Sequence, residues 1–99
     1  MTPDSHFQVL WSPRVRDALK KMSRKASPLV RKQLVEILRL LDARLTNNPL
    51  AVGEVYRTRE GIAEHLAVHE FLVIDFAVDE NRHLVLVRVC QSLSGHGID

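Results

Sequence analysis

The chain has 99 residues, 45% of them apolar and 26% charged, which is typical of one globular domain over residues 1–99 and excludes a disordered chain. The single cysteine, Cys90, excludes an internal disulfide, and no apolar run approaches the roughly 20 residues that a membrane-spanning helix needs. We therefore expect a cytoplasmic protein that does not associate with membranes.

The net charge of +2 is distributed unevenly along the chain. Ten basic residues and three acids lie between Ser12 and Leu45, whereas four basic residues and eight acids lie from Thr46 onward. Such a basic half indicates a surface that meets an anion, either a nucleic acid or an acidic partner chain. The alternative is an ordinary solvated helix face. A third interpretation, a DNA-binding helix-turn-helix, is supported only by this basic helical segment.

The first half of the sequence predicts one strand and two helices. Residues 6–11 are rich in aromatic and β-branched types and predict the strand. Serine followed by proline occurs at 12 and again at 27, and each pair supplies an N-cap and a proline at the first helical position. Apolar residues at helical spacing then predict helices at about 13–26 and 28–47, which should form an antiparallel pair.

The second half changes to strand-like patterns. Residues 50–61 are interpreted as a connection, with at most a short extended piece at 54–58. Three strands are then predicted, at 62–68, 71–78 and 83–91. The expected fold is α+β, with an N-terminal strand, an antiparallel helical hairpin and a three-stranded antiparallel meander, in the order β-α-α-β-β-β. The helices should cover one sheet face and leave the other open. The tail, 94–99, is expected to fray.

The last two strands predict a charged pair on the open face. If Val78 pairs with His83 across the turn at 79–82, Arg88 lies diagonal to Asp75. The opposite face would then be uniformly apolar and would face the core, with Leu72, Ile74, Phe76, Val78, Val85, Val87 and Val89. Two interpretations stay open: a structural ion pair, or a site in which Arg88 binds phosphate.

Further candidates lie before and within the first strand of the meander. Arg57 and Arg59 lie beside Tyr56, and a guanidinium fork matches phosphate while a tyrosine can stack on a base. A solvated loop is the alternative. His65 and His69 would share a zinc ion only on a helix, since on a strand they are about 13 Å apart, so we predict no metal site. The imidazole of His65 remains a candidate proton carrier.

The order of segments resembles the RelE/ParE toxin superfamily. The similar segments are "FQVLWSPRVRDALKKM", "PLVRKQLVEILRLLDARL" with "NNP" after it, "GIAEHLAV" and "FLVIDFAVDENRHLVLVRV". The resemblance implies the toxin half of a type II toxin–antitoxin pair, of the plasmid-stabilisation type. Some members cut messenger RNA on the ribosome, others poison DNA gyrase, and an antitoxin masks the toxin.

If the chain is an RNA-cutting member, we expect a metal-independent endoribonuclease without a cofactor that uses the candidate residues named above. Its catalytic residues would be Arg59, His65 and Arg88, and its RNA contacts Tyr56, Arg57, Arg59 and Arg88. The partners would be a cognate antitoxin and the ribosome or gyrase, with a homodimer compatible. The alternative is a non-catalytic binding protein of the same fold, either a gyrase inhibitor or an inactive toxin fold.

The sequence also departs from the superfamily's usual pattern. RNA-cutting members carry lysines and arginines on the strand after the long helix, whereas the strand predicted at 62–68 has none. The next strand lacks the usual Arg-apolar-apolar-Tyr start, and no tyrosine follows Tyr56. Activity therefore cannot be inferred from the fold alone.

Overall fold

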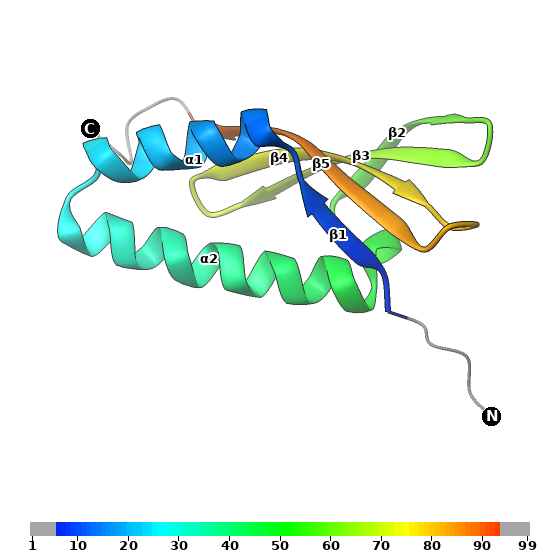
Figure 1. Cartoon of the computed structure of the whole chain (residues 1–99), viewed down its shortest axis with the longest axis horizontal. Helices are drawn as coiled ribbons and strands as arrows, with labels where there is room; N and C mark the ends of the chain where they lie inside the picture. Colours follow the sequence, from blue (N-terminus) through cyan, green and yellow to red (C-terminus); the bar gives the residue numbers. More distant parts are fainter. Residues whose placement is uncertain (1–5, 94–99) are drawn as a thin grey trace.

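The computed structural model describes residues 6–93, in which two helices run in opposite directions beside a twisted sheet (Figure 1). The elements are, in order, β1 (Gln8–Trp11), α1 (Pro13–Lys25), α2 (Pro28–Asn47), a short 3-10 helix η1 (Pro49–Ala51), β2 (Glu54–Arg59), β3 (Ile62–His69), β4 (Leu72–Asp79) and β5 (Leu84–Ser92). The predicted α+β class and the order of its first three elements are confirmed. The tail predicted to fray, 94–99, lies outside the described residues.

Local capping fixes both helices where the sequence predicts them. The side-chain oxygens of Ser12 and Ser27 accept hydrogen bonds from the backbone N–H groups three residues later, each at 3.2 Å. Between the helices, the Arg31 side chain donates to the carbonyl oxygens of Ser23 (3.1 Å) and Ala26 (3.2 Å). These bonds satisfy carbonyls at the end of α1 and hold the hairpin closed.

The sheet has five strands in the order β1-β5-β4-β3-β2, with β1 parallel to β5 and the other pairs antiparallel. The extended piece expected at 54–58 within the connection is confirmed, but it is a full edge strand, β2, and η1 precedes it. The chain enters β2 through Gly53, whose left-handed φ of 64° brings it against β3. The turn from β2 to β3 uses positive φ at Glu60 (51°) and Gly61 (80°), as tight hairpins require.

One sheet face and the helices enclose the core. Leu34, Ile37 and Leu41 of α2 are at most 3% exposed, and Phe76 of β4 is fully buried. Alternate β4 residues are buried, which leaves the intervening side chains on the face that the helices do not cover. We call this uncovered side the open face. Every residue of β2 is exposed, and the β2–β3 hairpin extends beyond the helices (Figure 1).

The predicted register between the last two strands is wrong. Val78 pairs with Val85 instead of His83, and beyond Phe76 the ladder shifts again, so that Asp75 lies opposite Val89. Val89 is therefore on the open face and 38% exposed, while Cys90 takes the next core position. The first error arose at the turn, which was expected to end at Arg82 but also includes His83, with its φ of 51°. The placement of Val89 in the core was wrong because strict alternation was assumed where the strand has an extra residue.

Within residues 6–93, no helix combines the length and apolar character that crossing a bilayer requires. In the same part of the chain, no three histidine, cysteine, aspartate or glutamate side chains are grouped so that they could hold a metal ion.

Candidate functional site

Two β-bulges lie at a tyrosine and an arginine of the open face. On β2, Val55 pairs with His65 and Arg57 pairs with Glu64, so Tyr56 is an extra residue. On β5, Phe76 pairs with Val87 and Asp75 pairs with Val89, so Arg88 is an extra residue. A bulge allows two successive side chains to lie on the same face. Tyr56 accordingly shares the open face with Arg57.

Asp75 joins the two bulged residues across the sheet. Its carboxylate accepts hydrogen bonds from Nε (3.2 Å) and Nη2 (2.5 Å) of Arg88, and from the hydroxyl of Tyr56 at 2.5 Å. Arg88 also donates through Nη2 to the Tyr56 oxygen at 3.0 Å. The hydrogen bond from Tyr56 to Asp75 is the main cause that raises the pKa of Tyr56. The hydrogen bond from Arg88 to the same carboxylate is the main cause that raises the pKa of Arg88. The predicted proximity of Asp75 and Arg88 is thus correct, although it arises from a different register.

Glu64 of β3 binds the arginines from two strands at once. Its carboxylate lies 2.6 Å from Nε of Arg57 and 2.9 Å from Nη2 of Arg88, with Nη2 of Arg59 at 3.8 Å. The hydrogen bonds from Arg57 and Arg88 lower the pKa of Glu64 below its usual value. Only 6% of the Glu64 side chain is exposed, because arginine side chains cover it at the surface.

We refer to Tyr56, Arg57, Arg59, Glu64, Asp75 and Arg88 together as the open-face cluster. Three arginines and two carboxylates leave it one positive charge in excess. A pocket of about 280 Å³ opens beside it, lined by Arg59, Glu60, Ile62, Glu64 and Arg88. Arg57 and Arg59 remain 50% and 68% exposed, so their outer N–H groups can reach a ligand.

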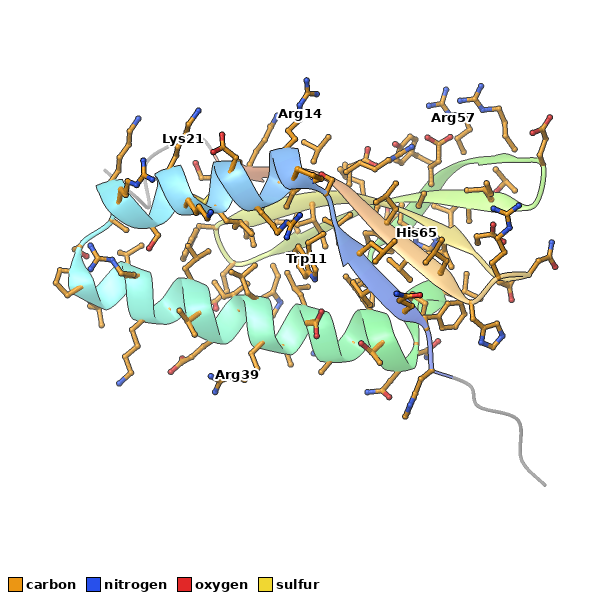
Figure 2. The ribbon with its side chains drawn as sticks, in the orientation of Figure 1. Trp11, Arg14, Lys21, Arg39, Arg57 and His65 are labelled. Carbon is orange, nitrogen blue, oxygen red and sulfur yellow. The ribbon has the colours of Figure 1, made fainter. Side chains whose placement is uncertain are left out.

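His65 lies on the other side of the sheet from the open-face cluster. Its ring is fully buried and stacks on Phe76 at 4.8 Å, and its Nδ1–H donates to the carbonyl oxygen of Val52 at 3.0 Å. Figure 2 shows His65 inside the molecule and Arg57 pointing outward from β2. The structure therefore separates His65 from Arg59 and Arg88, the other two residues predicted to be catalytic. His69 pairs with Leu72 on the same core-facing side.

The basic residues of the helices form a different surface. Figure 2 shows Arg14 and Lys21 pointing outward from α1 and Arg39 pointing outward from α2. Trp11 lies between β1 and α2, where its indole N–H donates to Asp42 at 3.0 Å. A groove of about 400 Å³ runs past it, rimmed by Arg16 and Arg39.

Exposed apolar side chains lie on the open face beside the open-face cluster. Leu66 and Val89 flank Asp75 in the register and are 46% and 38% exposed. Val68, farther along β3, is 58% exposed. Apolar residues next to tyrosine and arginine are the composition found at protein interfaces.

Solved structures that are similar to this one include chains of two RelE-type complexes. A chain of the RelBE2 toxin–antitoxin complex from Mycobacterium tuberculosis matches with a TM-score of 0.64 and 20% identity, over 88% of this chain and 91% of that chain. A chain of the archaeal RelE–RelB complex from Pyrococcus horikoshii OT3 matches with a TM-score of 0.65 and 10% identity, over 90% of this chain and 97% of that chain. The matched chains are RelE toxins. This chain has the RelE-like fold. No family model and no curated protein matches the sequence.

The RelE-like fold changes one comparison made from the sequence. The strand that follows the long helix is β2, not the segment at 62–68. This strand carries Arg57 and Arg59, so the basic residues missing at 62–68 are present one strand earlier. The other departures, in β4 and β5, remain.

Sequence reasoning missed Glu64 as a member of the cluster. The signal available was a single carboxylate within a strand of apolar residues and histidines. Its importance depended on β2 being a strand, because only the β2–β3 pairing places Arg57 opposite Glu64.

Proposed function

We propose that this protein is the toxin of a type II toxin–antitoxin pair and that the open face is its toxic surface. The observation that carries the proposal is the convergence of Arg57, Arg59 and Arg88 with Tyr56 on the uncovered face of a RelE-like fold. Guanidinium groups match phosphate oxygens, and tyrosine rings stack on unpaired bases. Single-stranded RNA is the target that this combination fits best.

Within this role, the proposed activity is cleavage of RNA without a metal ion. Such a site needs cations around the scissile phosphate and groups that exchange protons with it. The three arginines supply the cations. Since His65 lies in the core, the hydroxyl of Tyr56 replaces it as the proton donor, and the carboxylates of Glu64 and Asp75 are the available acceptors.

The proposed partner is a cognate antitoxin that covers the open face. Both structural neighbours come from complexes of a RelE-type toxin with its antitoxin. Exposed Leu66, Val68 and Val89 beside a cluster of arginines favour a partner segment that alternates apolar and acidic residues. Burial of that apolar surface would offset the cost of ordering such a segment.

A second candidate function is binding without catalysis, as in a gyrase inhibitor or an inactive toxin fold. The observation in its favour is that Arg57 and Arg88 are already paired with carboxylates. An arginine that is paired in this way can hold a partner protein without contacting any phosphate.

Expression without the antitoxin tests the proposal. Wild type should arrest growth, and new 5′ ends should appear in messenger RNA. Arg88→Ala should relieve the arrest, whereas Arg82→Ala should not, because Arg82 is 79% exposed in the β4–β5 turn and its ion pair is with Asp79, which is not part of the cluster. Circular dichroism should show both variants folded. Arrest with a DNA-damage response and no new RNA ends would support the gyrase alternative, and absence of arrest by wild type would refute the toxin role.

A further inference from the structure

The two carboxylates of the open-face cluster bind the same arginine atoms that a phosphate would use. Glu64 accepts from Nε of Arg57 at 2.6 Å and from its Nη2 at 3.2 Å, which is the two-pronged geometry of arginine with a phosphate. The same carboxylate lies 2.9 Å from Nη2 of Arg88. Glu64 thus bridges arginines of β2 and β5, as one phosphate group would.

Asp75 repeats this arrangement on the other side of Arg88. It takes both Nε and Nη2 of that guanidinium, so Arg88 has only its third nitrogen without a bond to the described residues. An incoming phosphate therefore meets two fixed negative charges and few free donors. Arg59, whose nearest contact to Glu64 is 3.8 Å, is the least engaged of the three arginines.

We propose that Glu64 and Asp75 form an internal anionic mask that weakens the binding of RNA phosphate by the open-face cluster. This inference rests on the proposed RNA contact and adds an autoinhibitory contact to it. Glu64 is the principal element, because it engages Arg57 and Arg88 together. The pocket of about 280 Å³ beside Glu64 gives its side chain room to move away when a phosphate binds.

Fixed charge gives the expected size of the effect. A carboxylate that shares an arginine with a phosphate is within a few ångströms of it, where repulsion between like charges is appreciable even at high dielectric. Glutamine at position 64 keeps the shape and one acceptor oxygen but removes the charge. Glu64→Gln should therefore bind RNA on the order of tenfold more tightly than wild type at low salt.

The experiment measures the binding of a short fluorescent single-stranded RNA to purified full-length variants by anisotropy. Glu64→Gln and Asp75→Asn should both tighten binding. Glu80→Gln is the matched control, because it makes the same charge change at an exposed position in the β4–β5 turn, and it should change affinity by less than about twofold. Adding Arg88→Ala to Glu64→Gln should abolish the gain. Thermal unfolding establishes that each variant is folded. If Glu64→Gln does not fold, Asp75→Asn still tests the proposal.

The outcomes separate this inference from the proposed function. If wild type binds RNA through Arg88 but neither Glu64→Gln nor Asp75→Asn binds more tightly than Glu80→Gln, the mask is refuted and the RNA contact stands. Weaker binding by both variants would also refute the mask and would make the carboxylates positioning groups for the arginines. If Arg88→Ala changes binding in neither the wild-type nor the Glu64→Gln background, both the mask and the RNA contact fail.

Discussion

Gly53 provides a sharp test of how β2 is held, because it is the residue through which the chain enters that strand. Its φ of 64° is in the left-handed region, and a Cβ at this position would lie 2.3 Å from the Leu66 carbonyl oxygen and 2.7 Å from the Ala67 Cβ. Gly61 has a similar φ of 80°, but its Cβ would meet only the Asn81 side chain, at 3.6 Å. Alanine would therefore adopt an unfavourable left-handed backbone at either position, but it would clash with β3 only at Gly53.

For alanine, the left-handed backbone costs about 1–2 kcal/mol at either position. Overpacking adds about 1–3 kcal/mol where atoms must move apart, which applies only at Gly53. We expect Gly61→Ala to lower the free energy of unfolding by about 1–2 kcal/mol and Gly53→Ala by about 2–5 kcal/mol. Urea unfolding with a common m-value measures both.

Amide chemical shifts test whether the substitution at Gly53 also disturbs the strands that carry the open-face cluster. Because the clash at Gly53 must displace β2 from β3, amide chemical shifts of Gly53→Ala should change along both strands. Those of Gly61→Ala should change only around the turn. Equal destabilisation by the two substitutions, or shift changes confined to residues next to Gly53, would refute the close approach on which the placement of Tyr56 and Arg57 depends.

Two further predictions concern the core. Leu41→Ala should lower the free energy of unfolding by about 2–5 kcal/mol, measured by heat or urea, because Leu41 is only 2% exposed. Leu40→Ala should lower it by well under half as much, because Leu40 is 39% exposed. Similar losses of stability at both positions would contradict this packing. Burial raises the pKa of the Cys90 thiol to about 11, so the folded protein should react slowly with a thiol reagent at pH 8 and faster as the pH approaches 11. Urea-unfolded protein should react rapidly at pH 8. Fast labelling of the folded protein at pH 8 would contradict the burial of Cys90.

The helices were predictable from sequence because their signals are local. A serine cap followed by proline fixes each start within one turn, and the apolar stripe selects the buried face. The strands β3, β4 and β5 were predictable from their β-branched and aromatic residues. Strand β2 was predicted only as a short extended piece within a connection. Its sequence is largely polar, every residue is exposed, and only the pairing with β3 makes it a strand.

The site was predicted less completely than the fold, for a reason that also concerns pairing. Arg57, Arg59, Arg88 and Tyr56 were identified because guanidinium and phenol groups suggest nucleic-acid contacts wherever they occur. Their mutual arrangement depends on pairing over sequence separations that no local pattern encodes. The core position of His65 was not predicted for the same reason, because its face follows from its pairing with Phe76 in the core.

The β2 bulge explains why Tyr56 and Arg57 both belong to the open-face cluster. With strict alternation, Tyr56 and Arg57 would lie on opposite faces of β2, and the same would hold for Arg88 and Val89 on β5. One extra residue in β2 instead leaves Tyr56 and Arg57 on the same face, and one in β5 leaves Arg88 and Val89 on the same face. Without the β2 bulge, either Tyr56 or Arg57 would turn to the core face. The composition of the open-face cluster is therefore set in part by the register of β2, whereas a regular β5 would also place Arg88 near Asp75.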